Sequence, residues 1–600
     1  MKAKSNFGCG FAACVLAGLV LFGCPLCSCG SVTIDPAKAA IVAPTGEKEA
    51  AEELRRHIRL IAGVDVPVVE KASAGAYAFT IAPSKIGDNP EACEWEVSDR
   101  GATFRGHVYF AVVDFLEDAL GVRWPEEDLV VYDAQNPIVV TKLSGSWAPA
   151  LKIRSLRHSD SDSKGEYGVV CSRFNRRMRA GRHAAPVYGH AFTKHWKLYG
   201  REHPEYFAMR RDGLRGPKNA KPEDLMGNVA VYAANVANTL GICTTSTGLV
   251  AQVVADWRKA GAGEYINLCE NDVPGQDSCQ CPACKALDVV PEKVDPKWET
   301  HYADRYVYFG NRVLEAARKF RPDVKVCYYA YNATQDAPRR QRPDPATVIG
   351  AVPTYFSYKY VADYVESWKK AGAEHFFYRP NRHHYFCCPY LPLSAEEHFY
   401  GLFRYLVEAG TIGFDYGAKS SVKGSYEWMD RYVLLHAMQD PSKPFSHWED
   451  HYFSAYGAAA EDAKAYWRFW RDEVWIKRLE PHMDDIAKKG KWFNFGRGLV
   501  HGLKNYYRAE DFVAAERFVK AAESRELTPV RRELARRLRV RHDHARLFFE
   551  AVANKSRANT EALIAYRKAH GFPLYHWYEQ YFGDITGVEK LLGPEKKESK

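Results

Sequence analysis

The sequence lacks the motifs of several common enzyme classes. It contains no GxSxG nucleophile elbow, no HExxH zinc motif, no GxxxxGKS/T phosphate loop and no GxGxxG fingerprint after a predicted strand. These absences argue against a serine hydrolase, a zinc protease and a nucleotide-dependent enzyme. Beyond the N-terminal segment, no stretch approaches 18 continuous apolar residues, so we expect no membrane-spanning helix.

A strong net charge is also missing. The chain has 83 basic and 74 acidic residues, which gives a formal charge of +9 with neutral histidines. Such a mild excess does not indicate a nucleic-acid partner, although it would favour an anionic substrate. Aromatic residues are abundant at 13%, which suits the stacking of sugar rings, although large cores also use them. A chain of 600 residues is too long for one core, so we expect two to four domains.

Residues 1–29 have the pattern of a targeting segment. Lys2 and Lys4 precede an apolar run from Phe11 to Phe22, which has the length of a signal-peptide core. Cys29 follows a small residue, Ser28, and therefore resembles the lipidated cysteine of bacterial lipoproteins better than Cys24 does. A plain secretory signal peptide, without lipidation, is the alternative. We expect an exported bacterial protein, either an envelope lipoprotein or secreted, whose membrane contact is at most a lipid anchor.

Residues 31–148 predict a small α/β accessory domain. Apolar residues at Ala51, Leu54, Ile58 and Ile61 have helical spacing, and Gly63 follows as a C-terminal cap. A second helix is expected over residues 109–120. Short strands are expected at 39–42, 64–69 and 77–81.

Strands and helices alternate over residues 149–425. The predicted strands are 152–156, 187–192, 265–269, 324–331, 347–352, 375–378 and 411–416, with helices such as 249–260 and 306–320 between them. This alternation indicates a parallel sheet, whose natural closed form at this length is a (β/α)8 TIM-like barrel. Because only seven strands are visible, one is missed or the barrel is irregular. Residues 426–600 have helical periodicity and predict an α-helical C-terminal region.

The stretch 265–288 carries the candidate catalytic groups. Its predicted strand ends on Glu270, Asn271 and Asp272, and catalytic residues of barrels lie at the carboxyl ends of strands. Two nearby carboxyl groups could raise each other's pKa, as a general acid requires. We predict Asp272 as the general acid, Glu270 as the alternative, and Asp415, at the end of strand 411–416, as the second carboxylate. Asp272 could instead cap its own loop.

Three cysteines follow the acidic residues: Cys279, Cys281 and Cys284. A structural zinc ion takes four ligands, and the fourth would have to be Cys269, Asp277 or a distant histidine. In an exported protein, a disulfide within the trio or free thiols compete with a metal. In each case the trio would shape the loop beside Asp272. We therefore expect no cofactor and no catalytic metal, and keep the three cysteines as weak metal candidates.

Basic and aromatic residues follow several predicted strands, where they could line the mouth of the barrel. Arginine pairs with a uronate or sulfate, and aromatic rings stack on sugars. A single histidine is more often a structural residue than a ligand. The candidate substrate-binding residues are His158, His190, His195, Glu205, Tyr331, Arg379, Arg382, His383 and Tyr416.

Two sets of motifs resemble known families. The AAxEL pattern at 50–54, Arg105-Gly106 and the FLExxLGxRW pattern at 115–124 resemble the accessory domain before the barrel of β-hexosaminidases and α-glucuronidases. The HPEYFA motif at 203–208, Asn271-Asp272 with the following CxCxxC, and the AY pair at 330–331 resemble DUF4838, a bacterial family of unknown function. The likeness covers about residues 36–440 and implies a carbohydrate-active envelope protein. β-Hexosaminidases carry an adjacent Asp-Glu pair where this chain has Glu-Asn-Asp.

The sequence therefore predicts a glycoside hydrolase that cleaves a glycan by carboxylate acid/base catalysis. A glycan that carries uronate or other anionic sugars is one candidate substrate. The alternative from another class is a non-catalytic glycan-binding envelope protein on the same barrel. A zinc-dependent enzyme built on the cysteine loop is a third reading. Two carboxyl groups about 5–10 Å apart in one cleft would favour the hydrolase, and one isolated carboxylate would favour the binding protein.

Overall fold

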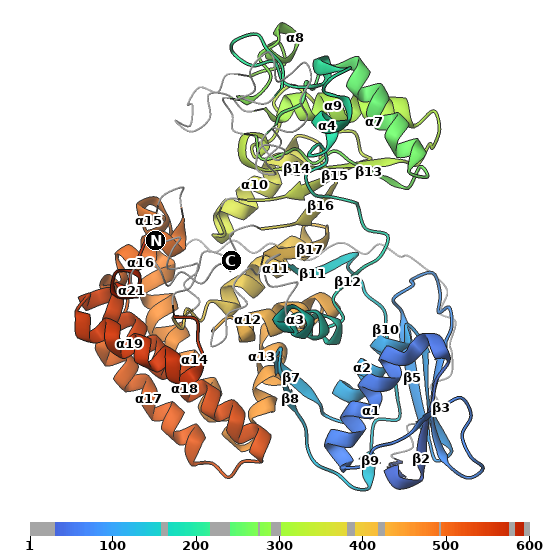
Figure 1. Ribbon diagram of the computed structural model, residues 1–600, viewed down its shortest axis with the longest axis vertical. Helices are drawn as coiled ribbons and strands as arrows, with labels where there is room; N and C mark the ends of the chain where they lie inside the picture. The colour runs from blue at the N-terminus through green and yellow to red at the C-terminus, as the bar shows by residue number, and fades with distance from the viewer. Residues whose placement is uncertain are drawn as a thin grey trace, which may run out of the picture.

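A computed structural model describes ten segments of the chain: residues 30–157, 166–216, 240–273, 277–289, 302–353, 355–380, 390–417, 426–490, 494–574 and 583–592. An α/β part, a central curved sheet with its helices and an α-helical part follow one another along the chain (Figure 1). The predicted targeting segment and the candidate residues His158, Arg382 and His383 lie outside the described residues.

The N-terminal part is a six-stranded sheet with two helices packed on one face. The helices α1 (Lys48–Ala62) and α2 (Val108–Asp118) contact each other and the sheet. Leu54, Ile58 and Ile61 of α1 are buried, as their spacing predicts, and Gly63 ends the helix in the left-handed region at φ 72°. The strand order is β10 (Ser144–Trp147), β5 (Cys93–Ser98), β6 (Gly101–Gly106), β4 (Tyr77–Pro83), β2 (Ala39–Val42) and β3 (Val68–Val69).

Two short antiparallel pairs complete this part. One joins β1 (Val32–Ile34) to β9 (Ile138–Val140). The other joins β7 (Arg123–Glu126) to β8 (Leu129–Val131), and it lies next to the C-terminal helices.

The central sheet has seven strands, of which six run parallel. β12 pairs with β11 in the antiparallel direction. The order is β12 (Gly181–Arg182), β11 (Ile153–Arg157), β17 (Thr411–Gly417), β16 (His375–Tyr378), β15 (Thr347–Ala351), β14 (Lys325–Ala330) and β13 (Tyr265–Asn267). Ile153 near one end of this order and Cys269 beyond the other end belong to one buried cluster, so the sheet curls around an apolar interior.

The curled sheet confirms the predicted TIM-like fold class, but within the described residues it does not contain eight parallel strands. The predicted strand 187–192 is irregular and lies beside β13 through other hydrogen bonds. The Asn267 side chain donates to the Gly189 carbonyl at 2.8 Å, and the Ala191 N–H donates to the Cys269 carbonyl at 2.9 Å. This segment therefore lies beside β13 without forming a regular ladder.

Helices cover the outside of the curled sheet. α9 (Ala303–Ala317) packs on β14, α11 (Glu396–Glu408) packs on β17, and α12 (Trp428–Gln439) packs on β11. Only a 3-10 turn (Asn332–Thr334) and a loop join β14 to β15. The other helices of this part are α3 (Glu166–Arg177), α4 (His195–Tyr199), α7 (Thr247–Lys259), α8 (Pro282–Lys285) and α10 (Tyr358–Lys370).

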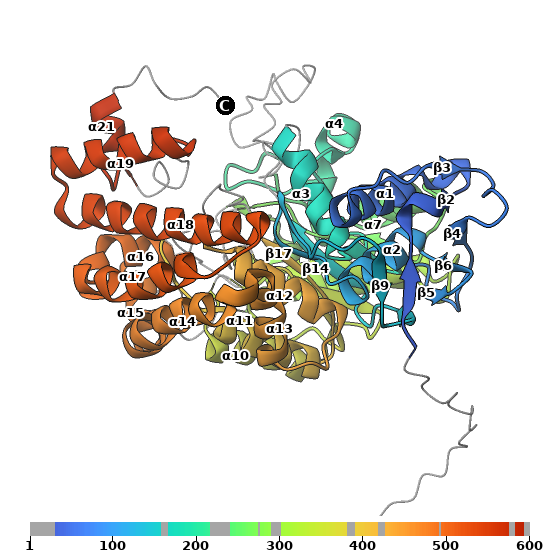
Figure 2. The ribbon, with the colours of Figure 1, turned by 90° about the horizontal axis from the view of Figure 1, so that it is seen from below.

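The C-terminal part is helical, as its periodicity predicts, and Figure 2 shows it on the side of the molecule opposite the N-terminal sheet. Its helices are α13 (Phe445–Phe453), α14 (Ala460–Trp470), α15 (Met483–Lys489), α16 (Phe495–His501), α17 (Ala509–Ser524), α18 (Pro529–Asn554), α19 (Arg557–His570) and α21 (Val588–Leu592). Across the part of the chain that the structure describes, no helix has both the length and the apolar character needed to cross a bilayer.

Candidate active site

Charged side chains meet inside the curled sheet at the carboxyl ends of three strands. In β17, Phe414 and Tyr416 pack into the core beneath the helices, so Asp415 between them faces the interior. Arg157 ends the neighbouring strand β11, and Arg379 follows β16 on the other side. Adjacent parallel strands thus bring the three side chains together.

Asp415 is surrounded by arginines. Its Oδ2 lies 3.4 Å from Nε of Arg157, 3.5 Å from Nε of Arg379 and 3.7 Å from a terminal nitrogen of Arg182. The carboxylate is buried, with 1% of its side chain exposed. Burial lowers the pKa of Arg157, and the charge of Arg379 acts in the same direction. Among the described side chains, one carboxylate thus faces three guanidinium groups.

Aromatic rings form a wall beside this cluster. The ring of Tyr188 stacks on Phe377 with centroids 4.5 Å apart. The guanidinium group of Arg182 lies 4.5 Å from the Tyr188 ring centre, and that of Arg379 lies 5.1 Å from the Tyr329 ring centre. These distances are within the range of cation–π contacts, which hold the arginines against flat surfaces. A sugar ring could stack on such a wall.

Asp272 and His190 form a second polar group at the same end of the sheet. Oδ2 of Asp272 lies 3.4 Å from Nε2 of His190, and Asp272 is about half exposed. Nδ1 of His190 lies 2.6 Å from the Glu270 carbonyl oxygen, which only accepts, so Nδ1 carries a proton. The hydrogen bond with Asp272 raises the pKa of His190 although burial opposes it. The Tyr329 ring contacts His190 edge-on at 6.4 Å, which links this pair to the arginine cluster.

Glu270 has a different environment from Asp272. Its Oε1 accepts a hydrogen bond from the Thr334 hydroxyl at 2.5 Å, while Oε2 has no hydrogen-bond partner among the described residues. Burial raises the pKa of Glu270 to about 8, so the carboxyl group is protonated at neutral pH. It lines a cavity of about 20 Å³ together with Tyr302, Tyr306 and Tyr331.

The alternation that would place Glu270 and Asp272 on one face does not hold. β13 ends at Asn267, three residues before Glu270, so the period of two does not continue to the carboxylates. The Glu270 side chain accepts a hydrogen bond from Thr334, whereas the Asp272 side chain contacts His190.

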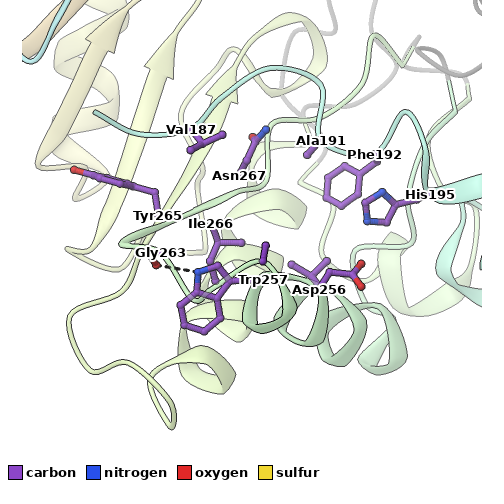
Figure 3. A pocket seen from close by; sticks show the side chains of 12 residues that line it. Val187, Ala191, Phe192, His195, Asp256, Trp257, Gly263, Tyr265, Ile266 and Asn267 are labelled. Atoms are coloured by element: carbon purple, nitrogen blue, oxygen red, sulfur yellow. Dashed lines mark hydrogen bonds between the residues drawn. The ribbon is translucent and has the colours of Figure 1, made fainter. Parts of the chain in front are cut away.

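Several predicted substrate-binding residues lie away from this site. His195 lines a cavity of about 370 Å³ between α7 and β13, on the flank of the sheet (Figure 3), where burial lowers its pKa. Tyr416 is buried against Phe414, on the opposite face of β17 from Asp415. Glu205 is exposed and pairs with His203 at 3.1 Å. Their predicted roles therefore find no support in their positions.

Other predicted residues lie at or next to the mouth. His190 and Arg379 take part in the two polar groups described above. Tyr331 is half-buried beside Glu270. The sequence did not single out Arg182 or Tyr188. Arg182 lies in the two-residue strand β12, which was not predicted, and Tyr188 lies inside the predicted strand 187–192 and not at its carboxyl end, where candidate residues were sought.

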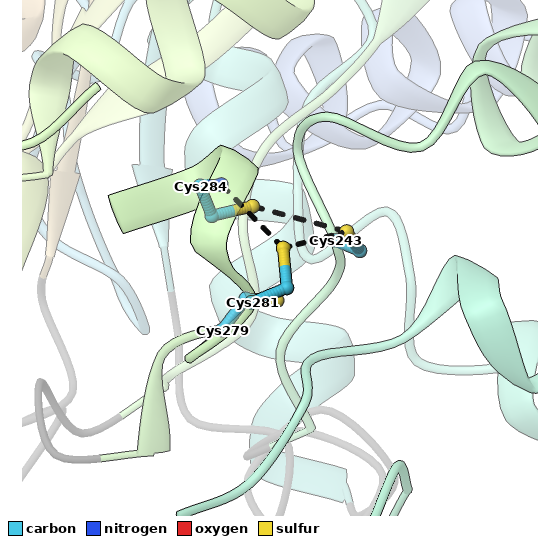
Figure 4. Close-up of side chains that lie close together, drawn as sticks. All are labelled: Cys243, Cys279, Cys281 and Cys284. Atoms are coloured by element: carbon cyan, nitrogen blue, oxygen red, sulfur yellow. Dashed lines mark hydrogen bonds between the residues drawn. The ribbon is translucent and has the colours of Figure 1, made fainter. Parts of the chain in front are cut away.

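Two groups of described residues have the composition of metal sites. One unites Cys243 with the predicted trio Cys279, Cys281 and Cys284 (Figure 4). The other consists of Glu117, His436 and His451. The expected fourth ligand was Cys269, Asp277 or a histidine, so Cys243 corrects that expectation: it is 36 residues earlier in the chain than the first cysteine of the trio and is brought there by the fold.

Comparisons with known proteins identify the family. The model of DUF4838, described as a domain of unknown function, matches residues 124–468. A search of curated proteins found no match. Among solved structures, the chain is similar to the GH20 β-N-acetylhexosaminidase of Streptomyces coelicolor A3(2), with 11% identity and a TM-score of 0.42 over 72% of this chain and 93% of that one. It is also similar to the chitobiase of Flavobacterium johnsoniae, with 10% identity and a TM-score of 0.42 over 94% and 97%.

These two similarities are too low to carry any inference about substrate or mechanism. The family match is stronger evidence, because it spans more than half of the chain and includes all strands of the curled sheet. It also agrees with the resemblance that the HPEYFA and CxCxxC motifs indicate. The chain belongs to the DUF4838 family.

Proposed function

We propose that this protein is a glycoside hydrolase whose active site lies at the carboxyl ends of the parallel strands. The observation that carries the proposal is the pairing of an accessible carboxylate–imidazole couple with an arginine-rich aromatic wall. Tyr329 contacts His190 on one side and Arg379 on the other, so the two groups belong to one site. The family is one of unknown function, so the argument rests on these side chains.

Asp272 and His190 would act as the proton donor. A general acid must hold its proton near the working pH and must reach the leaving oxygen. The raised pKa of His190 keeps a proton on the couple, and the half-exposed Asp272 meets the requirement of access. The proton held between Nε2 and Oδ2 would pass to the glycosidic oxygen as its bond to the anomeric carbon breaks.

Glu270 is a weaker candidate for this role. Its pKa of about 8 keeps it protonated, but its carboxyl group is buried and bonded to Thr334. A leaving oxygen in the mouth could reach it only after the loop moved. We therefore assign Glu270 to holding the loop of β14 and not to proton transfer.

Arg157, Arg182 and Arg379 would bind an acidic group of the substrate, such as a uronate carboxylate or a sulfate. Among the described side chains, three guanidinium groups gather around one carboxylate, and guanidinium groups bind carboxylates and sulfates by charged hydrogen bonds. In this proposal Asp415, which the sequence suggested as the second catalytic carboxylate, orients the arginines. A group of the substrate or a residue outside the described segments would then assist at the anomeric carbon.

One observation favours a non-catalytic glycan-binding protein as the second candidate. Of the three predicted catalytic carboxylates, Glu270 and Asp415 are buried and only Asp272 is exposed. A binding protein needs the arginine-rich wall but no second reacting carboxylate. Such a protein would bind acidic glycans and release no product.

An activity screen separates the two candidates. The purified protein is incubated with aryl glycosides of neutral sugars and of uronic acids, and with acidic and neutral polysaccharides, while released phenol and new reducing ends are measured. The hydrolase proposal predicts turnover of an acidic substrate that Asp272→Asn abolishes. Asp323→Asn, a matched change of an exposed aspartate just before β14, should keep full activity. Binding of acidic glycans without turnover would reject the hydrolase in favour of the binding protein.

A further inference from the structure

Four cysteine side chains converge beside the loop that follows β13. Cys243 lies in the loop before α7, whereas Cys279, Cys281 and Cys284 lie in the segment after Asp272 (Figure 4). All four are buried, with at most 6% exposure, and all four Sγ atoms lie within 4.8 Å of one another. None of them is in a disulfide.

The spacing of the sulfur atoms fits a tetrahedral metal site. Zinc–sulfur bonds of about 2.3 Å in a tetrahedron place neighbouring sulfurs about 3.8 Å apart. Sγ of Cys243 lies 3.8 Å from Sγ of Cys281 and 3.8 Å from Sγ of Cys284. A disulfide needs a sulfur–sulfur distance of about 2.05 Å and would leave two of the four buried thiols unused.

Hydrogen-bond donors surround the sulfurs, as thiolate ligands require. The backbone N–H of Met209 donates to Sγ of Cys279 at 3.3 Å, and that of Cys284 donates to Sγ of Cys281 at 3.4 Å. The Thr245 hydroxyl lies 3.2 Å from Sγ of Cys284. Such contacts from the surrounding shell stabilise metal-bound thiolates.

A positive charge also faces the cluster. The guanidinium group of Arg215 forms a hydrogen bond with Cys243 and lies near Cys279 and Cys281. Four thiolates with one divalent cation carry two net negative charges. Arg215 therefore offsets charge that four neutral thiols would not have.

The second group with metal-site composition has no room for a cation. Oε1 of Glu117 lies 2.7 Å from Nε2 of His436, and its Oε2 accepts a hydrogen bond from Arg179 at 2.9 Å. The guanidinium group of Arg179 already supplies the positive charge. Of these two groups of described residues, the cysteine group alone offers soft sulfur ligands.

We propose that Cys243, Cys279, Cys281 and Cys284 bind one Zn²⁺ ion in a closed structural site. Because the protein supplies all four ligands, no coordination position is open for a substrate or a water molecule, so the role is structural. Cys269, the nearest other cysteine in the sequence, belongs to the buried cluster inside the curled sheet and is not a ligand. The site does not depend on the proposed glycoside hydrolysis.

The zinc ion would fix the loop that carries Asp272. It joins the loop of Cys243 to the segment of the other three cysteines. The same two loops are also joined by a hydrogen bond, because the side chain of Asn271 donates to the Leu240 carbonyl at 2.9 Å. Asp272 is the next residue, so its position relative to His190 depends on both loops. Loss of the metal would loosen this part of the mouth while the sheet stays folded.

Metal analysis of the full chain tests the proposal. The protein is expressed in zinc-supplemented medium and purified without a metal-affinity tag. Its zinc content is then measured by inductively coupled plasma mass spectrometry. We expect one zinc ion per chain in the wild type. Cys243→Ser should lose most of this zinc. Cys93→Ala, which removes a buried thiol of the N-terminal sheet, should keep all of it. Replacement by Co²⁺ should give the visible absorption of tetrahedral thiolate coordination.

Two results would overturn the proposal. The first is wild-type protein that holds no zinc after purification and gives no tetrahedral Co²⁺ spectrum when metal is added. The second is a disulfide within the four cysteines, detected by peptide mass spectrometry after alkylation under denaturing conditions. Both measurements use the wild type, so they decide the matter even if Cys243→Ser does not fold. Neither uses activity, so failure of the hydrolase proposal leaves this test intact.

Discussion

At the scale of single residues, burial gives two neighbouring carboxyl groups opposite properties. Glu270 is buried and accepts a hydrogen bond from the Thr334 hydroxyl, so ionisation would place a charge out of contact with water. Asp272 reaches solvent and shares a contact with His190. The same acid function thus becomes a neutral internal group at one position and a reactive candidate two residues later.

Glu270→Gln should reduce the loss of stability that occurs as the pH rises from about 4.5 to about 8. The folded-state pKa of about 8 is above the ordinary value of 4.5, so the folded protein keeps a proton that the unfolded chain has released. Stability therefore falls as pH rises between these values, by about 1.4 kcal/mol per pH unit for this group. Urea unfolding across this pH range measures the slope, which should be shallower in Glu270→Gln.

Glu205→Gln serves as the control for that experiment, because Glu205 is exposed and its substitution should leave the slope unchanged. Glu396, another buried glutamate with a pKa raised to about 8, keeps part of the slope in both variants. An unchanged slope in Glu270→Gln would show that Glu270 ionises normally in the folded protein.

Arg379→Gln should weaken the binding of acidic sugars more than that of neutral sugars. A charged hydrogen bond contributes about 1.5–3 kcal/mol, which corresponds to a roughly 10- to 100-fold loss of affinity for the acidic ligand. Calorimetric titration of matched uronic and neutral oligosaccharides measures the difference. Arg321→Gln, which changes an arginine just before β14, is the control. An equal loss for both ligand types would contradict the anion-binding role.

At the scale of elements, hydrophobic spacing predicted several of the regular helices and strands, but it missed β5, β6 and β10 of the N-terminal sheet. α1, α7 and β16 lie where Leu54, the stretch 249–260 and the stretch 375–378 indicated. The strand prediction failed where a side-chain hydrogen bond takes the place of backbone pairing between strands. The stretch 187–192 alternates like a strand, but Asn267 bonds it to β13 through its side chain, and no local pattern encodes that pairing.

A buried ion network connects the N-terminal part to the helices of the central curled sheet. Arg179, after α3, pairs with Asp114 and Glu117 of α2, and it also bonds Gln439 of α12. Arg179→Met would leave two buried carboxylates without their cation, so we expect a loss of about 3–5 kcal/mol in the free energy of unfolding. Denaturant unfolding measures this loss.

The matched control is Arg557→Ala, which breaks an exposed pair with Glu561. Exposed pairs contribute less than about 1 kcal/mol, so this variant should unfold almost like the wild type. If Arg179→Met were as stable as Arg557→Ala, the network would not hold the parts together.

At the scale of the whole molecule, the N-terminal part is attached to the C-terminal helices by buried ion pairs. Glu126 of β7 accepts hydrogen bonds from Arg537 and Arg541 of α18. Asp133 and Arg531 add a further pair between the same parts. These contacts predict that the two parts unfold together in one calorimetric transition.

Glu126→Gln tests this coupling. The amide keeps the shape but removes the charge that the two arginines share, so the single transition should broaden or split. Asp128→Asn, at a more exposed partner of Arg537, should leave one transition. Separate transitions in the wild type itself would contradict the coupling.

Long-range convergence explains why the sequence could not supply the whole site. Asp415, Arg157 and Arg379 are far apart in the chain and meet only because β11, β17 and β16 are neighbours in the sheet. Cys243 joins the cysteine trio for the same reason. Motif spacing marked the residues of one loop, but it carries no information on which distant loop packs against it.

The most direct test of the central claim is the kcat/KM of Asp272→Asn on the best acidic substrate found in the activity screen. Loss of a general acid costs about 10²- to 10⁴-fold in rate. We predict a loss in this range, with circular dichroism unchanged and with Asp323→Asn equal to the wild type. Wild-type turnover by Asp272→Asn would contradict the assignment of proton transfer to the Asp272–His190 couple.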